Sequence, residues 1–298
     1  MADPTCIVCG GTLVPAVARP RSSYAALGSY RIDACGGCGA GMTMPRPSAE
    51  DLARCYETTY GYSTHDLIEV EKRRRAAALL DWSGVSAGRI LDIGCMFGFL
   101  LDEAARRGLV PSGVELSSGA AVAAAARGHD VFPGTIEAFA RSRPGLRFDA
   151  IFAQHVLEHV PDPRGFLELA RAMLAPGGKL VLCVPNFEAR LRKLAPSGWG
   201  WYQVPVHLHH FSSRALRRLL GDAGLEVVTE RTRGGDTLFL MLSALQTLGA
   251  DLAGSAGDRT PRLARAALRV VGEVTRPYYA LGDDELAVIA RPAPQLDG

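Results

Sequence analysis

The sequence predicts an α/β protein with a mostly parallel sheet, helices on both of its faces, and a small cysteine-rich module in front. Two observations support this fold class. From Arg89 onward, short apolar runs alternate with helical segments, an order that produces parallel strands joined by crossover helices. Ahead of that region, four of the seven cysteines form two C-x2-C pairs. We expect a cysteine module at residues 1–43, a helical lid or linker at 44–84 and a main domain at 85–298.

The length and composition fit a globular protein and favour some function classes over others. The 298 residues include 48% hydrophobic and 21% charged residues, and the net charge is only +2. This balance gives no reason to expect a nucleic-acid partner, and the basic run Lys72–Arg75 is typical of a solvated helix face. The start of the chain, MADPTCIVCGG, lacks the features of a secretory signal, so we expect a cytoplasmic location.

The cysteine pairs predict a metal site in the module. Each two-residue gap lets both thiolates reach one face of a tight turn, and Gly10 and Gly39, one after each pair, permit the positive φ that such a turn needs. Four thiolates leave no open coordination position, which favours a structural zinc over a catalytic one. Four cysteines without a metal remain the alternative. The predicted ligands are Cys6, Cys9, Cys35 and Cys38.

Between the module and the main domain, the sequence predicts a hairpin and two helices. Residues 24–33 have alternating patches suited to a short hairpin. Ser48, with Asp51 three residues later, is an N-cap signature, so a helix should begin near Ala49. A second helix is expected over residues 66–82.

The main domain shows seven strand-like runs separated by helical patterns. The strands are expected at residues 90–93, 110–116, 129–132, 150–154, 179–184, 225–229 and 285–291, and the helices at 99–107, 119–127, 165–174 and 213–223. Residues 236–282 form an insertion whose apolar part is too short to span a bilayer. It predicts a core or dimer-forming helix; a substrate lid or interfacial membrane contact is the alternative.

The first strand-to-helix turn is the expected floor of a ligand site, since ligands bind beyond the carboxyl ends of parallel strands. Gly94 would let the chain bend after Asp92, and Gly98 would let the helix begin close to the ligand. Met96 stands where a loop of this shape usually has a glycine. Glu115 ends the second strand, where a carboxylate can accept hydrogen bonds from two ribose hydroxyls. An NAD-binding loop remains an alternative.

Four motifs in order, LDIGCMFGF, GVELS, FDAIFAQHVLEHVPDP and LAPGGKLVLCVPN, resemble the class I S-adenosylmethionine-dependent methyltransferases. The resemblance covers about residues 85–235 and implies a Rossmann-like, seven-stranded, mostly parallel sheet. It also implies that the last strand, residues 285–291, forms an antiparallel edge. Thr135 occupies the place of an aspartate that faces adenine in many members, so adenine recognition would fall to its neighbours. The residues expected at the cofactor are Asp92, Gly94, Cys95, Gly98, Glu115, Leu116, Ile136, Glu137 and Gln154.

The front of the chain resembles part of that family as well. The two C-x2-C pairs, followed by PRPS, a helix and a Tyr-rich segment, are similar to methyltransferases that modify sugars and natural products, including sugar C-methyltransferases. The resemblance implies a small hydroxylated substrate such as a sugar nucleotide, a glycoside or a natural-product intermediate.

Two histidine clusters follow strands and provide candidate general bases, because histidine titrates near neutral pH. The predicted catalytic residues are His155, His159, His207 and His210. Trp199, Trp201, Tyr202 and His209 are expected to form a wall for the substrate. For each cluster the alternative is structural: a packing histidine at 155, a structural turn at 158–159, and a buried loop anchor at 199–210. Ubiquinone-type O-methyltransferases resemble the 155–159 segment, but His155 replaces their first glutamate, which puts a magnesium site there in doubt.

The function expected from the sequence is S-adenosylmethionine-dependent O-methylation of a small hydroxylated metabolite, with a histidine as general base. C- or N-methylation of a similar substrate is the enzymatic alternative. A zinc-module docking protein with an inactive methyltransferase core is an alternative of another class. A homodimer through the C-terminal insertion is possible, and no nucleic-acid partner is expected.

Overall fold

The computed structural model describes residues 5–18, 20, 29–59, 66–194, 199–234 and 282–294. The chain divides into two compact units. Unit 1 consists of Met1–Leu52, Pro185–Ala215 and Arg231–Leu286, and unit 2 of Ala53–Val184, Leu216–Glu230 and Ala287–Gly298. The helical insertion expected at 236–282 lies almost entirely outside the described residues, so it stays a prediction. No helix in the described ranges has both the length and the apolar character required to cross a bilayer.

Unit 2 is built on a seven-stranded sheet, as the sequence predicts. Its order is β10-β11-β8-β7-β4-β5-β6, and the pairs from β8 to β6 are parallel. The strands are β4 (Arg89–Ile93), β5 (Val110–Glu115), β6 (Asp130–Pro133), β7 (Phe148–Gln154), β8 (Leu174–Pro185), β10 (Leu225–Arg233) and β11 (Glu285–Pro292). The strand order reverses at β4, which lies between β5 and β7, so the edge beyond β4 is the expected ligand position.

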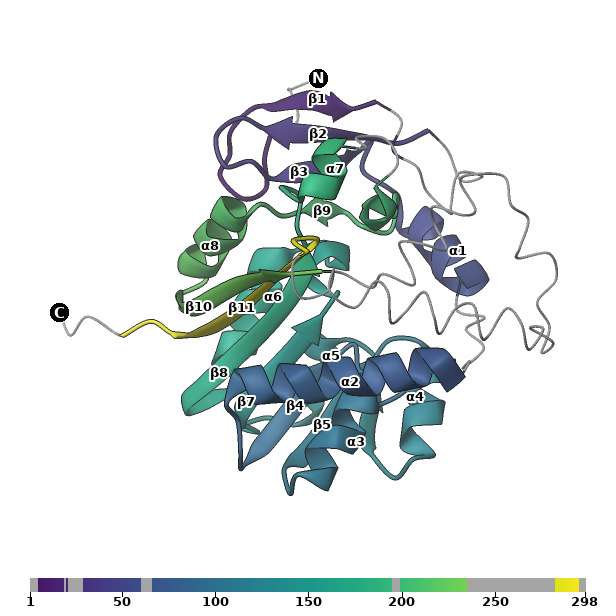
Figure 1. The fold of residues 1–298 in the computed structure, drawn as a ribbon, viewed down its shortest axis with the longest axis vertical. Coiled ribbons are helices and arrows are strands. Elements are labelled where there is room, and N and C mark those ends of the chain that lie inside the picture. Colours follow the sequence, from purple (N-terminus) through teal and green to yellow (C-terminus); the bar gives the residue numbers. More distant parts are fainter. Residues whose placement is uncertain are drawn as a thin grey trace. The chain divides into compact units, whose positions relative to one another are not determined.

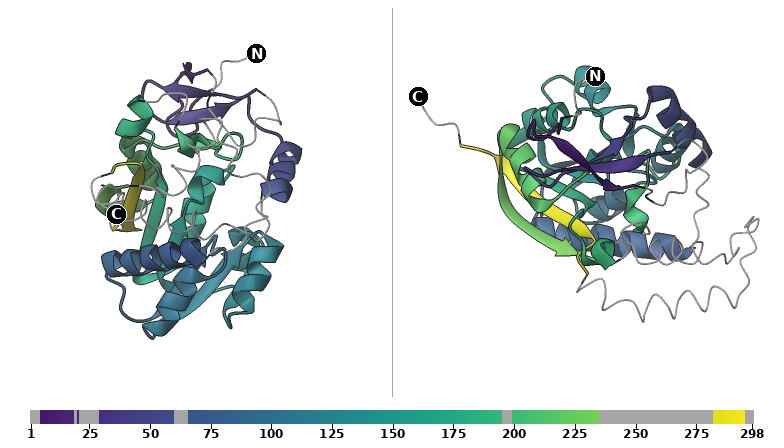
Figure 2. Two further views of the ribbon diagram at one scale, coloured as in Figure 1. Left: turned by 45° about the vertical axis from the view of Figure 1, so that its right-hand side comes forward. Right: turned by 90° about the horizontal axis from the view of Figure 1, so that it is seen from above.

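Helices cover both faces of this sheet (Figures 1 and 2). They are α2 (Asp66–Ser83), α3 (Phe99–Arg106), α4 (Ser118–Ala125), α5 (Ile136–Ser142), α6 (Pro163–Ala172) and α8 (Ser213–Asp222). Helices α2 and α3 pack on the face that carries Ile90, Phe152 and Val181, where Leu79 and Leu100 complete the core. The central strands are buried on both faces, which explains their nearly continuous apolar sequences.

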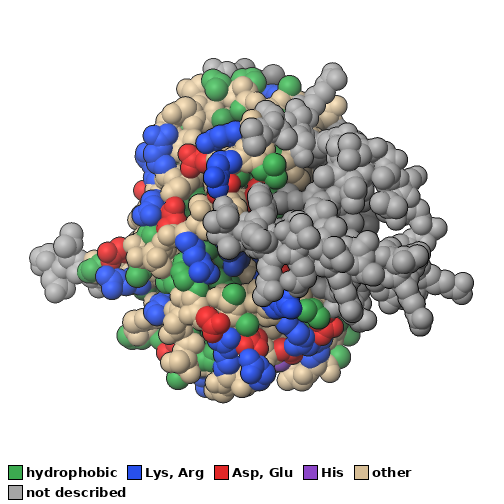
Figure 3. Space-filling model, in the orientation of Figure 1, with side chains coloured by type: hydrophobic (Ala, Val, Ile, Leu, Met, Phe, Trp, Pro, Cys, Tyr) green, Lys and Arg blue, Asp and Glu red, His purple; other side chains and the backbone are tan. Residues whose placement is uncertain are grey.

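The charged residues of α2 fit the solvated-face interpretation of the basic run. Figure 3 shows basic and acidic side chains interspersed over the part of the molecule where α2 lies. Arg73 forms ion pairs with Glu69 at 2.8 Å and with Asp102 at 2.9 Å. The guanidinium of Arg73 also lies 5.6 Å from the ring centre of Phe99, so this basic residue links α2 to α3.

Three features of unit 2 differ from the sequence-based expectations. Strand β11 lies between β10 and β8 rather than at the edge, in keeping with burial: six of its eight residues are buried, but only one of the nine residues of β10. Helix α5 was not expected; it is capped by Thr135, whose hydroxyl accepts from Ala138 N at 3.3 Å. Strand β8 begins five residues earlier than the predicted position 179 and is irregular opposite β7.

Unit 1 contains a four-stranded antiparallel sheet in the order β1-β2-β3-β9. Its strands are β1 (Leu13–Val17), β2 (Arg31–Cys35), β3 (Gly41–Met44) and β9 (His209–His210). Strands β1 and β2 pair in antiparallel fashion. The hairpin expected at residues 24–33 falls partly on residues 21–28, which lie outside the described ranges, so it stays a prediction. Strand β9 joins the cysteine module although it is far away in the sequence, because residues 209–210 pair with 41–42.

The boundary between the parts therefore differs from the simple sequence division. Residues 185–215, which contain the short helix α7 (Arg190–Leu194), belong to the same compact unit as the cysteine module. Helix α1 (Ala49–Thr59) begins where the N-cap signature places it: Ser48 Oγ accepts from Asp51 N at 3.0 Å and donates to the Asp51 carboxylate at 2.7 Å.

Candidate active site

The turn after β4 has the geometry predicted for a cofactor loop. Gly94 and Gly98 have φ values of +72° and +80°, which only glycine adopts without strain. Gly94 N and Cys95 N both donate to Val114 O of β5, at 2.8 and 3.2 Å, so the neighbouring strand holds the turn. A Cβ on Gly98 would lie 3.1 Å from the His129 ring, so this glycine permits the close packing of helix α3.

Met96 has a left-handed backbone conformation, of the kind that favours glycine. Its φ is +49°, in the left-handed region that costs a non-glycine residue about 1–2 kcal/mol. In this conformation its backbone N–H donates to Glu115 Oε2 at 2.9 Å. The side chain at position 96 therefore does not prevent the backbone of the loop from bonding to Glu115.

Glu115 is held by backbone donors at the carboxyl end of β5. Its Oε1 accepts from Ser117 N at 2.7 Å, and its Oε2 accepts from Met96 N. The residue is only 4% exposed. An ionised carboxylate has about four acceptor positions, so two backbone bonds leave capacity for the hydroxyls of a ribose. Its place and chemistry fit the predicted role.

Asp92 is the buried negative group of the loop. It is 4% exposed, and no cation among the described residues pairs with it. Burial, followed by the charge of Glu115, raises the pKa of Asp92 well above its usual range. A cationic ligand group would relieve this unfavourable position, and S-adenosylmethionine carries both an ammonium and a sulfonium. The loop therefore fits this cofactor.

The remaining predicted cofactor residues have different surroundings. Leu116 is 63% exposed directly after Glu115, which is where an apolar side chain can cover a flat base. Gln154 ends β7 and is half-buried at the same edge. Cys95, in contrast, turns inward: a Cβ on Gly113 would lie 2.6 Å from its Sγ. Only the Cys95 backbone is available to the site.

The segment around Thr135 divides its side chains between core and solvent. Thr135, in the place of the adenine-facing aspartate, caps α5 instead. Ile136 is buried in the core, whereas Glu137 is exposed on the first turn of α5. The structure therefore does not bring these two side chains together, and the adenine assignment stays a prediction.

His155 stands at the end of β7 beside the cofactor turn. Its φ is +52°, and its N–H donates to Cys183 O of β8 at 2.8 Å. The next residue reaches the turn, since a Cβ on Gly94 would lie 2.7 Å from Val156 Cγ2. The His155 side chain is 23% exposed, and its Nδ1 lies 3.2 Å from Oε1 of the buried Glu158. His159, also predicted as catalytic, is half-buried in the short 3-10 turn Leu157–His159.

The second histidine cluster lies in the interior of unit 1. His207 Nδ1 is 2.8 Å from Trp201 O, so this nitrogen carries the proton and donates to the carbonyl. Thr43 donates its hydroxyl proton to His207 O at 2.6 Å and therefore accepts from His210 Nε2 at 3.1 Å. His209 Nδ1 lies 3.4 Å from Met42 Sδ. These contacts bind β9 to β3.

The environment of His210 does not fit the predicted role of general base. The residue is buried, and burial, then the charges of His209, Arg192 and Arg46, lower its pKa to about 3. A group with this pKa has little affinity for a proton at neutral pH. Its bond to Thr43 gives it a structural role.

The aromatic residues expected to form a substrate wall are core residues of unit 1. Trp199, Trp201 and Tyr202 pack with Val17 and Ile32 in one buried cluster. The Trp199 indole donates to Asp284 Oδ1 at 3.1 Å, and its ring meets that of Tyr202 edge to face. The structural alternative, a buried anchor, describes this segment better.

The four predicted metal ligands converge in unit 1. Their sulfur atoms all lie within 4.8 Å of one another, with Cys6 and Cys38 3.5 Å apart and Cys9 and Cys35 3.4 Å apart. Gly10 and Gly39 have φ values of +74° and +78°, as predicted for the two turns. This group could hold a tetrahedral zinc ion.

Backbone N–H groups near the cysteines favour the thiolate form of one ligand. Burial alone would raise the pKa of Cys35, but hydrogen bonds from the backbone of Cys38 and Gly37 and from the Cys9 thiol lower it to about 7. Burial raises the pKa of Cys6 and Cys38. A thiol with a lowered pKa loses its proton readily, and the thiolate is the form that binds metal. With three further thiols beside it, this group is suited to bind a metal ion.

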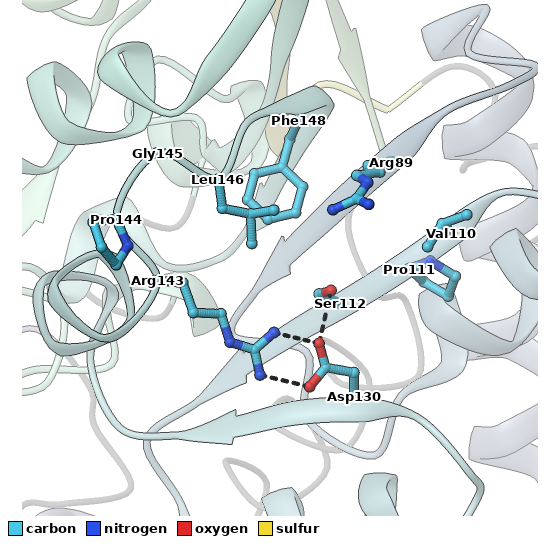
Figure 4. Close-up of a pocket in the computed structure, with 10 residues that line it drawn as sticks. All are labelled: Arg89, Val110, Pro111, Ser112, Asp130, Arg143, Pro144, Gly145, Leu146 and Phe148. Atoms are coloured by element: carbon cyan, nitrogen blue, oxygen red, sulfur yellow. Dashed lines mark hydrogen bonds and ion pairs between the residues drawn. The ribbon is translucent and has the colours of Figure 1, made fainter.

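A hollow of about 560 Å³ lies at the opposite edge of the seven-stranded sheet (Figure 4). Residues at the amino ends of β4, β5, β6 and β7 line it, and the Asp130 carboxylate there pairs with Arg143 at 2.7 Å and with Ser112 at 3.1 Å. Ligands of parallel α/β sheets bind at the carboxyl edge. The β4 turn, rather than this hollow, is therefore the candidate active site.

Comparison with known proteins identifies the family. The model of a family described as "Methyltransferase domain" matches residues 65–230, more than half of the chain. The chain belongs to this methyltransferase family. The methyltransferase is 31% identical over 159 residues to the ubiquinone biosynthesis O-methyltransferase of Pseudomonas paraeruginosa, a match that covers 49% of this chain and 67% of the relative. It is 30% identical over 168 residues to the enzyme of the same name from Azoarcus sp., covering 50% and 71%.

Solved structures share the fold of the methyltransferase. An S-adenosylmethionine-dependent methyltransferase from Archaeoglobus fulgidus superposes with a TM-score of 0.50 at 19% identity, covering 76% of this chain and 99% of that one. A methyltransferase from Bacillus halodurans gives 0.51 at 16% identity, covering 74% and 100%. At these identities the likeness concerns the fold alone. Together with the family match, it makes this protein an S-adenosylmethionine-dependent methyltransferase and decides against an NAD-binding loop.

Proposed function

We propose that this methyltransferase methylates a hydroxyl oxygen of a small hydroxylated metabolite and that His155 is the general base. The observation that carries the proposal is the position of His155. It directly follows β7, the strand next to β4, and its neighbour Val156 reaches the Gly94 turn. It would thereby stand beside the methyl group of the bound cofactor, and its side chain, which is 23% exposed, would be open to a ligand.

Each part of the carboxyl edge would contribute a separate function. Bound S-adenosylmethionine supplies a methyl group on an activated sulfonium. Glu115 would hold the ribose hydroxyls, Asp92 would neutralise the cationic end, and Leu116 would cover the base. His155 would accept the proton of the acceptor hydroxyl, because a neutral alcohol is a weak nucleophile. Alignment of that oxygen with the methyl group would account for much of the remaining rate.

That oxygen is the methylated atom is part of this proposal, and C- or N-methylation is the alternative. The curated relatives are named O-methyltransferases, which supports oxygen as the acceptor. The sugar-nucleotide, glycoside or natural-product class of substrate rests on the sequence of the cysteine-bearing front. The intact loop around Glu115 and the family match speak against the alternative of an inactive docking protein.

A structural zinc ion on Cys6, Cys9, Cys35 and Cys38 is a further part of the proposal. The convergence of the four sulfur atoms within 4.8 Å supports it. Such a site requires reduced thiols, which also agrees with the proposed cytoplasmic location.

The test is a methylation assay with S-adenosylmethionine labelled by carbon-13 in the methyl group and a panel of sugar nucleotides, glycosides and phenols. The carbon shift of the product distinguishes O-, N- and C-methylation. We expect His155→Ala to lower kcat by about 100-fold or more while cofactor affinity, measured by calorimetry, changes less than about threefold. Loss of affinity equal to the loss of turnover would assign His155 a structural role instead.

Arg143→Gln is the matched control for this assay. It lies at the opposite edge of the same sheet, in a half-exposed ion pair with Asp130, and should leave turnover unchanged (Figure 4). If the wild-type protein did not bind S-adenosylmethionine at high micromolar concentration, the proposed methyltransferase activity as a whole would be contradicted.

A further inference from the structure

The structure places a buried carboxylate behind the proposed base. Glu158 belongs to the 3-10 turn that follows His155, and the turn returns its side chain to the histidine. Oε1 of Glu158 lies 3.2 Å from Nδ1 of His155. The glutamate side chain is 1% exposed, whereas the histidine side chain is 23% exposed, so one partner is in the interior and the other faces outward.

The backbone of His155 shows that its orientation is maintained against a conformational preference. A φ of +52° is unfavourable for a residue with a Cβ, and such strain persists only where the surroundings compensate for it. The N–H of His155 bonds to Cys183 O at 2.8 Å, and its ring bonds to Glu158. The first contact fixes the backbone, and the second fixes the rotation of the ring.

The chemistry of the pair determines which nitrogen can serve as a base. An ionised carboxylate has only acceptor atoms, so the His155 nitrogen facing it must carry the proton. Nδ1 is then the donor, and Nε2 is the basic nitrogen, on the side of the ring away from Glu158. Free histidine prefers the opposite tautomer, with the proton on Nε2. A second function of the carboxylate is to stabilise the imidazolium that forms when the base accepts a proton.

We propose that Glu158 is the positioning residue of this active site: it holds His155 in the Nδ1–H tautomer and presents Nε2 to the methyl acceptor. The inference rests on the proposed function of His155 as general base. It extends that function, because it names the group that selects the reactive nitrogen. Glu158 itself would touch neither substrate nor cofactor.

The experiment measures the tautomer and the kinetics of the same variants. In wild-type protein labelled with nitrogen-15 on histidine, we expect the ring shifts of His155 to show the Nδ1–H form, with the assignment made from His155→Gln. Glu158→Ala should convert the signal to the Nε2–H form. It should also lower kcat by about 10–100-fold, with KM and cofactor affinity within about threefold of wild type. Glu158→Asp should recover part of the lost turnover.

Two further measurements keep the outcomes separate. Glu158→Gln retains the size of the side chain and has a carbonyl that can accept from Nδ1. It replaces Glu158→Ala as the test variant if Glu158→Ala does not fold. For Glu158→Gln we expect the Nδ1–H form of His155 with reduced kcat. Glu226→Gln, an exposed carboxylate that pairs with Arg291 on the same sheet, should change neither readout. An unchanged tautomer in Glu158→Ala, or turnover within threefold of wild type, would overturn the inference. The tautomer is read without substrate, so it tests Glu158 even if His155 proves not to be the base.

Discussion

At the scale of single residues, the cofactor loop combines two unfavourable features that its ligand function explains. Met96 has a left-handed backbone that suits glycine, and in this conformation its N–H reaches Glu115. Asp92 is a buried carboxylate close to a second one. Both reduce the stability of the ligand-free protein, and both contribute to a site for a cationic, ribose-containing cofactor. Such conflicts between stability and function concentrate at active sites.

For Met96 we compare two substitutions at one position. Met96→Gly removes a backbone cost of about 1–2 kcal/mol but adds about 0.5–1 kcal/mol of entropy cost in folding, so its free energy of unfolding should remain within about 1.5 kcal/mol of wild type. Met96→Val should be less stable than Met96→Gly by at least about 1 kcal/mol, because a β-branched residue tolerates positive φ poorly. Urea denaturation measures both. Equal stabilities would mean that the loop changes its path when residue 96 is replaced.

For Asp92 the prediction concerns the pH dependence of stability. Its pKa is raised in the folded state, so the folded protein favours the protonated carboxyl. The resulting loss of stability is absent below the unfolded pKa of about 4 and is complete above the folded pKa. Asp92→Asn should therefore stabilise the ligand-free protein by about 1 kcal/mol or more at pH 8 but not at pH 4, and should weaken cofactor binding at least about tenfold.

Thermal melts at the two pH values and calorimetry with S-adenosylmethionine measure these effects. Asp130→Asn, an exposed carboxylate at the opposite edge, is the control and should leave cofactor affinity unchanged. A stabilisation equal at both pH values would contradict the assignment of a raised pKa.

At the scale of elements, the two-residue strand β9 determines the role of the histidine-rich segment. Because residues 209–210 pair with β3, the rings of His207, His209 and His210 are buried within unit 1 and are held by hydrogen bonds from or to Thr43, Trp201 and Met42. The same pairing places Trp199 and Tyr202 in the core. The segment is thus a structural component of the cysteine-bearing unit.

The buried His210 predicts a loss of stability in mild acid. Its pKa of about 3 in the folded state lies below the unfolded value of about 6.5, so the unfolded chain takes up a proton first as the pH falls. Stability is retained above about pH 6.5 and decreases toward pH 3, by about 2 kcal/mol at pH 5. His210→Gln should be less stable than wild type at pH 7 but should lack this part of the pH dependence.

The measurement is urea denaturation at pH 7 and 5, with zinc in excess so that metal loss does not contribute. Identical pH slopes for wild type and His210→Gln would show that His210 does not titrate on unfolding. His129→Gln removes a histidine of unit 2, whose Nε2 lies 2.7 Å from Asp102, and controls for the loss of a histidine outside unit 1.

At the scale of the whole molecule, the proposed cofactor site and the proposed zinc site are formed by different compact units. All predicted cofactor residues belong to unit 2, and all four cysteines belong to unit 1. Unit 1 is assembled from three separate stretches of the chain, and its four-stranded sheet is small. Small units of this kind often depend on a metal for their stability.

Elemental analysis should find about one zinc per chain, and Cys6→Ser or Cys38→Ser should lose it. Removing the metal should abolish protection from hydrogen exchange in β1, β2, β3 and β9, since structural zinc contributes about 10 kcal/mol or more to such modules. Protection in β4, β5 and β7 should persist. Cys183→Ser, a buried cysteine of unit 2, controls for the loss of a thiol as such. A metal-free wild type with the same exchange pattern would contradict a structural zinc.

The sequence by itself determined the local features: the parallel α/β order, the turns after each cysteine pair, the capped start of α1 and the cofactor turn with Glu115 at the next strand end. Each depends on residues close together in the chain, whose conformational preferences are readable from type and spacing. Only the tertiary structure decided that β11 is an inner strand, that residues 199–210 are core rather than substrate wall, and that Glu158 stands behind His155. These outcomes depend on long-range strand pairing and burial, in which neighbours that are distant in sequence determine whether a histidine, an aromatic ring or a carboxylate faces a ligand or the interior.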